Sequence, residues 1–99
     1  MNYRIRFTRE AENDLIHLYE FLLVEDIDAA ARALEAITKG IEFLKCFPFS
    51  CRKATDENPL LRELLISFGN AGYVVLFEIE DQQTITILAV RHQREEDYY

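Results

Sequence analysis

The last ten residues, VRHQREEDYY (Val90–Tyr99), collect the side chains of this sequence that are best suited to chemistry. Arg91 and Arg94 carry positive charge, and Tyr98 adds a phenolic hydroxyl near the end. A histidine between two arginines, as His92 is, can transfer protons or simply form a hydrogen bond. Both roles stay open for His92, and this segment is the first candidate for a functional site.

Other signatures of catalysis are missing from the sequence. It has no glycine-rich phosphate loop, no pair of catalytic carboxylates, no Ser-His-Asp arrangement and no metal-ligand spacing. Cys46 and Cys51 lie close together without a nearby histidine, so we expect reduced thiols rather than a disulfide or a zinc site. His17 falls among the apolar positions of a helical pattern, which favours a boundary histidine. The sequence therefore predicts neither a metal nor a cofactor.

Length and composition indicate one domain over residues 1–99. The chain has 99 residues, of which 49% are hydrophobic, so it can form a core. No apolar run reaches the roughly 18 residues that span a bilayer, and no signal peptide is present, so we expect a cytoplasmic protein without membrane contacts. The net charge of −7 argues against a broad grip on nucleic acid, because phosphate binding needs clustered lysine and arginine.

The first half of the chain reads as a strand followed by two helices. The alternation in NYRIRF predicts a half-buried strand. Thr8 is a suitable N-cap for a helix over about residues 9–24, and Asp28 is the expected cap of a second helix that runs to Leu44. Each helix has one apolar stripe, and a link of about four residues (25–28) predicts an antiparallel hairpin.

The second half reads as an irregular loop and three strands. Pro48 ends the second helix, and residues 49–59 are polar and without periodicity. LRELLISF, YVVLFEI and TITILAV are strands joined by the turns GNAG and EDQQ, and both glycines of GNAG can take positive φ. The order β-α-α-β-β-β predicts an α+β fold, with a helical hairpin packed on a mainly antiparallel four-stranded sheet.

This meander brings distant residues to one end of the sheet. The end of LRELLISF, the GNAG turn, Tyr73 and Arg91 meet there, and the segment with His92 and Arg94 leaves from the same place. Arg62 lies several steps of ~3.3 Å away along its strand. Arg91 and Arg94 are therefore the cations expected at this end.

Several segments together resemble the RelE/ParE toxins of bacterial type II toxin–antitoxin systems, often called plasmid stabilization proteins. They are EAENDL at the start of the hairpin, FP after the second helix, LREL, GYVVLFEI and ILAVRHQRE, and they cover almost the whole chain. The resemblance implies the same fold and a toxin that a co-expressed antitoxin neutralises. It also implies one of two targets, since RelE-like members cleave mRNA on the ribosome without a metal and ParE-like members poison DNA gyrase.

The cations of the RNA-cleaving members transfer to this sequence only in part. Arg62 matches the first basic position on the second strand, but Leu64 stands at the second, and Val74 replaces the arginine after the Gly-Tyr pair. Arg94 matches a basic position near the C-terminus, and Tyr98 or its neighbour matches the terminal tyrosine. Because a phosphate under attack gains negative charge that such cations stabilise, their loss favours a ParE-like member.

We therefore expect a toxin that inhibits gyrase by protein–protein contact, through a surface that contains Arg62, Tyr73, Arg91, His92 and Arg94. One alternative is a ribosome-dependent mRNA endonuclease that uses Arg62, Arg91, His92, Arg94 and Tyr98. Another is a non-toxic relative that only binds an antitoxin. The expected partners are a cognate antitoxin, held by mainly apolar contacts, and gyrase, with the ribosome and mRNA as the alternative target and a homodimer left open.

Overall fold

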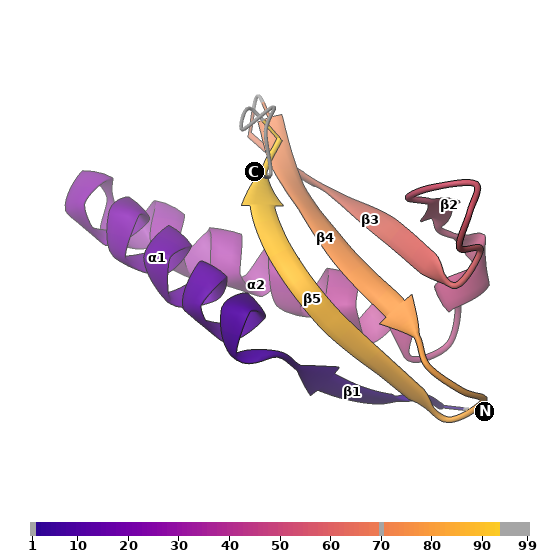
Figure 1. Ribbon diagram of the computed structural model, residues 1–99. Coiled ribbons are helices and arrows are strands. Elements are labelled where there is room, and N and C mark those ends of the chain that lie inside the picture. Colours follow the sequence, from indigo (N-terminus) through magenta and orange to yellow (C-terminus); the bar gives the residue numbers. More distant parts are fainter. Residues whose placement is uncertain (1, 70, 94–99) are drawn as a thin grey trace.

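The computed structural model describes residues 2–69 and 71–93, which form two helices and a sheet (Figure 1). The first half contains β1 (Arg4–Phe7), α1 (Arg9–Glu25) and α2 (Ile27–Leu44). The second half contains a 3₁₀ turn, η1 (Pro48–Ser50), and the strands β2 (Arg52–Lys53), β3 (Leu61–Phe68), β4 (Ala71–Ile79) and β5 (Thr84–His92). The predicted α+β class is confirmed.

The sheet has the strand order β1-β5-β4-β3-β2. Its three long strands form the predicted antiparallel meander, and β1 lies parallel to β5 at one edge. The expected count of four strands was wrong, because the presumed loop contains β2, where Arg52 pairs with Glu63. An ion pair of 3.0 Å between these two side chains stabilises the pairing. A strand of two residues shows no alternation that could mark it in the sequence.

The helical hairpin is tighter than expected. Thr8 caps α1 as predicted, and its hydroxyl accepts from the N–H of Ala11 at 3.0 Å. The cap of α2, however, is Asp26, whose carboxylate accepts from the N–H of Asp28 at 2.9 Å. Both the cap at Asp28 and the four-residue link were wrong, because the extended backbone of Asp26 ends one helix while its side chain starts the next.

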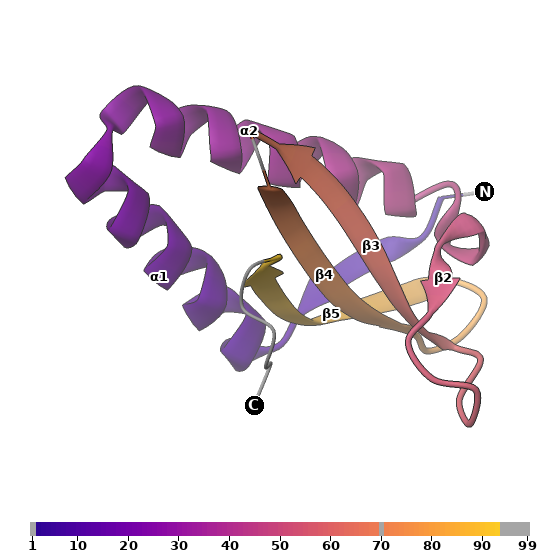
Figure 2. The same cartoon turned by 90° about the horizontal axis from the view of Figure 1, so that it is seen from above.

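The helices diverge from this link (Figure 2), and α2 lies behind the sheet in the view of Figure 1. α1 packs against β5 instead. Within the described residues, neither helix is long and apolar enough to cross a membrane. One hydrophobic core joins the helices to the sheet. Its fully buried members include Ala11, Leu44, Tyr73, Val75, Phe77, Ile85, Ile87 and Val90.

Each of the three glycines has a structural reason. Gly69 takes the predicted positive φ, at 61°. Gly72 does not, and instead lies so close to β3 that a Cβ would be 1.9 Å from the carbonyl oxygen of Ile66. A Cβ at Gly40 would lie 2.8 Å from Cδ1 of Ile66, so this glycine lets α2 approach the sheet.

Candidate functional site

One end of the sheet carries the predicted cluster around β4 and β5 (Figure 1). Tyr73 pairs with His92 across the two strands, and Val74 pairs with Arg91. The rings of Tyr73 and His92 meet edge to face with their centroids 5.5 Å apart. The structure therefore brings Tyr73, Arg91 and His92 together, as the sequence predicts.

Tyr73 supports this end of the sheet from the core. Its side chain is only 1% exposed, and the ring of Phe68 lies 5.9 Å away. Burial raises the pKa of the Tyr73 phenol, so the hydroxyl stays protonated at neutral pH. Tyr73 can hold His92 in place, but its own ring offers almost no surface to a partner.

Arg91 is held by α1 through Asp14. Its Nη1 forms an ion pair with Oδ2 of Asp14 and donates to the carbonyl oxygen of Val90 at 3.2 Å. The same Oδ2 accepts from the N–H of Val90 at 3.0 Å. The register of β1 ends where Phe7 meets Ile87, so beyond that point none of the described strands flanks the outer edge of β5. The Asp14–Arg91 pair satisfies both backbone groups of Val90 where a further strand would otherwise bind.

Sequence reasoning missed Asp14, although a signal for it exists. Asp14 lies three residues after Ala11 and four before Leu18, and both of these belong to the apolar stripe of α1. The Asp14 side chain is accordingly only 17% exposed. An acid on the buried side of a helix needs a partner, and here the end of β5 provides it.

Arg62 lies at the other end of β3, and the preceding loop occupies its guanidinium. Nε donates to the carbonyl oxygen of Pro59 at 2.7 Å, and Nη1 donates to those of Cys51 at 2.8 Å and Phe49 at 3.3 Å. The guanidinium carbon also lies 5.3 Å from the centroid of the Phe49 ring. Since the register partner of Arg62 is Phe77, the structure does not bring Arg62 to the cluster at the end of β5.

The two positions matched to missing cations lie on opposite faces of the sheet. Leu64 faces α2, since its Cδ2 would lie 3.2 Å from a Cβ at Gly40. Val74 pairs with Leu65, whose side chain points to the other face because side chains alternate along a strand. Val74 is also 5% exposed. Neither position offers charge, and the two could not act together on one phosphate.

The remaining candidates, Arg94 and Tyr98, lie outside the described residues. Across residues 2–69 and 71–93, no three His, Cys, Asp or Glu side chains gather as a metal ion requires. Cys46 is exposed and Cys51 is buried, and the structure joins neither in a disulfide. Burial raises the pKa of the Cys51 thiol, and the nearby charge of Arg62 opposes this only in part.

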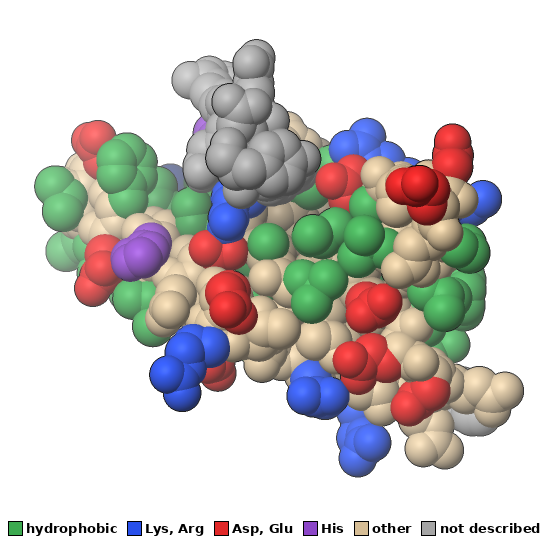
Figure 3. Space-filling view, viewed as in Figure 1, with side chains coloured by type: hydrophobic (Ala, Val, Ile, Leu, Met, Phe, Trp, Pro, Cys, Tyr) green, Lys and Arg blue, Asp and Glu red, His purple; other side chains and the backbone are tan. Residues whose placement is uncertain are grey.

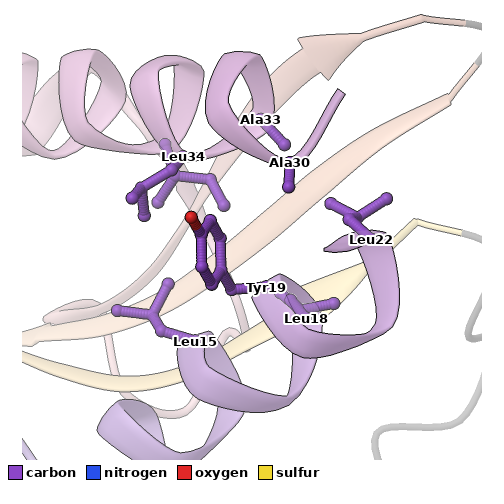
Figure 4. A pocket seen from close by; sticks show the side chains of 8 residues that line it. Leu15, Leu18, Tyr19, Leu22, Ala30, Ala33 and Leu34 are labelled. Atoms are coloured by element: carbon purple, nitrogen blue, oxygen red, sulfur yellow. The ribbon is translucent and has the colours of Figure 1, made fainter. Parts of the chain in front are cut away.

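A shallow apolar hollow of about 280 Å³ lies between β1 and the two helices. Next to it the helices enclose a space of only about 10 Å³, which is room for one water molecule. Figure 4 shows how Tyr19 of α1 points toward Leu34 of α2 and lines that space. The open hollow and its rim are called the hairpin groove. Its apolar side chains are Ile5, Phe7, Leu15, Ile16, Leu34, Ile37 and Ile41.

The hairpin groove exposes large apolar side chains. The exposed fraction is 53% for Ile16, 43% for Leu34 and 37% for Phe7. Apolar side chains that adjoin one another in this way on a small domain usually mark a binding surface. The groove is therefore a second candidate site, and one that the motifs of the sequence did not single out.

The sheet face turned away from α2 has a different character. Figure 3 shows apolar side chains near its middle with acidic side chains around them. Two acids of the sheet form ion pairs, since Glu63 contacts Arg52 and Glu80 contacts Arg6 at 3.1 Å. Among the described residues, two of the arginines near this face, Arg6 and Arg52, are thus engaged by acids rather than free to bind phosphate.

Comparison with known proteins identifies the family of this chain. A family model described as the ParE toxin of the type II toxin-antitoxin system, parDE, matches residues 5–97. The chain belongs to the ParE toxin family. The expectation of a ParE-like rather than a RelE-like member is thereby confirmed.

The ParE fold is also found in a similar solved structure, the "Chromosomal ParDE TA system from P. aeruginosa". It superposes with a TM-score of 0.70 at 20% sequence identity, over 91% of this chain and 95% of that chain. At this identity the match establishes the shared fold. No curated protein matches the sequence.

Proposed function

We propose that this ParE family member is a toxin that inhibits DNA gyrase through protein–protein contact in the cytoplasm, and that a cognate antitoxin neutralises it. The proposal rests on one observation: none of the described positions that match the cations of RNA-cleaving relatives offers a free positive charge. Leu64 packs toward α2, Val74 is buried, and the guanidinium of Arg62 donates to three backbone carbonyl oxygens.

Cleavage of RNA would need positive charge at these positions. The attacked phosphate gains negative charge in its transition state, and fixed cations are the usual means of stabilising it. Inhibition by protein contact has no such requirement. It needs an accessible surface with some ordered anchors, which Arg91 and His92 provide at the end of β5.

The hairpin groove is the surface that we assign to the antitoxin. Its apolar side chains are costly to leave in water, at about 25 cal/mol per Å². A partner segment with apolar anchors would cover Ile16, Leu34 and the neighbouring groove residues. The charged side chains that border the hollow are Glu42 and Lys45, which form an ion pair of 2.8 Å, and Arg9 and Glu12 lie at the rim beside Ile16.

Inducible expression in bacteria tests the proposal. Gyrase inhibition predicts growth arrest together with trapped DNA–gyrase complexes and a DNA-damage response, while the pattern of ribosome-bound mRNA stays intact. Cuts in mRNA at the ribosomal A site that vanish with Arg94→Ala or Tyr98→Phe would establish the endonuclease instead. Growth without any arrest would indicate the non-toxic antitoxin-binding relative.

A further inference from the structure

Asp14 makes an uncommon set of contacts for a residue in the middle of a helix. One carboxylate oxygen, Oδ2, accepts from the backbone N–H of Val90 and pairs with Nη1 of Arg91. The Asp14 and Arg91 side chains are 17% and 25% exposed, so water screens their attraction only in part. Hydrogen bonds with an ionised partner are among the stronger ones in proteins.

These contacts fix the part of β5 that β1 does not reach. β1 ends opposite Ile87, and from there α1 provides the partners of the strand edge. The hydroxyl of Thr8 donates to the carbonyl oxygen of Leu88 at 3.4 Å, and Asp14 and Arg91 bind both backbone groups of Val90. The end of the strand is thereby tied to the helix rather than to another strand.

The same contacts order Arg91, one of the side chains at the end of β5 that we assign to target contact. Arginine has many rotamers, and ordering it on binding costs affinity. With Nη1 fixed by Asp14, the guanidinium is already oriented, and its donors at Nε and Nη2 lie on the same rigid plane. His92 follows directly and rests edge-on against Tyr73.

We propose that Asp14 is a positioning residue for toxin activity, because it holds Arg91 in the orientation in which this side chain contacts the target. This inference rests on the proposed function, in which the end of β5 touches a protein target. Asp14 acts through Arg91 and has no direct contact with the target. Removing its charge should release Arg91 while the fold stays intact.

The test uses three variants of the full chain, expressed from an inducible promoter. Asp14→Asn keeps a side-chain oxygen for the N–H of Val90 but removes the charge that orients Arg91. Asp14→Ala removes both contacts. Glu20→Gln is the matched control, since it removes one acidic charge from the exposed side of the same helix. Surviving colonies after induction, thermal unfolding and amide exchange at Val90 are measured for each.

With Asp14→Asn we expect roughly tenfold more survivors than with wild type, while the unfolding temperature and the Val90 exchange rate stay near their wild-type values. With Asp14→Ala the Val90 amide should exchange at least about tenfold faster, and survival should rise further. Glu20→Gln should leave as few surviving colonies after induction as the wild type.

Two results would overturn the proposal. One is a fully toxic Asp14→Asn variant, and the other is a loss of toxicity that merely follows a drop in its unfolding temperature. Failure of the proposed function is seen separately, in a wild-type chain that does not arrest growth. That result would also remove the positioning role, because no target contact would remain for Asp14 to support.

Discussion

The end of β5 and the hairpin groove differ in whether their side chains already have partners within the protein. At the end of β5, Arg91 is paired with Asp14, and His92 rests on Tyr73. In the groove, Ile16 and Leu34 are about half exposed. The first region is a small ordered surface with fixed polar groups, whereas the second gains free energy only when something covers it. The comparison suggests that the groove supplies affinity for an antitoxin and the end of β5 supplies specificity for a target.

The largest expected effect is the loss of antitoxin affinity when a charged side chain is introduced into the hairpin groove. Leu34→Asp places a carboxylate in the apolar lining of the hollow, and we expect antitoxin affinity to fall by about 100-fold or more, the loss typical of an apolar anchor that a partner covers. Titration calorimetry of the purified pair measures it. Leu65→Asp is the matched control, because Leu65 is 47% exposed but lies on the other face of the sheet. Equal losses for both variants would mean that the groove is not the antitoxin surface.

Removing Arg62 should affect stability rather than target recognition. Arg62→Ala deletes three hydrogen bonds to backbone carbonyl oxygens and the contact with Phe49, so we expect a loss of about 2–3 kcal/mol in the free energy of unfolding. Urea unfolding measures it, with the exposed Lys53→Ala as the control. A stable Arg62→Ala variant that no longer arrests growth would show instead that Arg62 takes part in target recognition.

Salt should have little effect on antitoxin binding if the groove contributes most of the affinity. We expect the Kd to change by less than about threefold between roughly 0.05 and 0.5 M NaCl, because screening weakens exposed charge pairs and leaves apolar contacts nearly unchanged. Titrations at both salt concentrations decide this. A drop of about 100-fold in affinity would show that charge pairs hold the antitoxin.

The smallest expected effect concerns Cys51. Burial raises the pKa of its thiol in the folded state above the ordinary value of 9.0. A raised folded pKa means that the stabilising contribution is complete below about pH 9 and is lost as the pH rises through the folded value. Above pH 9 the free energy of unfolding should thus fall more steeply with pH for the wild type than for Cys51→Ala. The two slopes should differ by less than ~1.4 kcal/mol per pH unit, which is the limit for one proton. Urea midpoints over this range test the sign, and parallel curves would contradict it.

The long elements could be predicted from the sequence because their patterns are local. The strand LRELLISF and the cap at Thr8 match the structure, since alternation and capping depend on neighbouring residues. β2 has only two residues, and it depends on a separate strand, where Arg52 pairs with Glu63 and Lys53 with Arg62. Tertiary pairing of this kind leaves no periodic trace.

The residues of the candidate site could also be predicted only in part. The antiparallel order of the three long strands, which the sequence predicts, was enough to place Tyr73 and Arg91 at one end of the sheet. It could not show that Arg62 is bound to the loop at Phe49 and Cys51, or that Asp14 reaches β5, because both depend on side-chain packing between elements far apart in sequence. The groove was hidden for a related reason, since its residues come from three separate elements.

Purified components can distinguish contact with a protein target from the cutting of RNA. The purified protein is added to purified gyrase with relaxed plasmid DNA, and in parallel to a translating extract with a defined mRNA. If the proposed function is right, we expect loss of supercoiling and trapped, cleaved plasmid in the first reaction and intact mRNA in the second. Normal supercoiling together with mRNA cut at the ribosomal A site would contradict it.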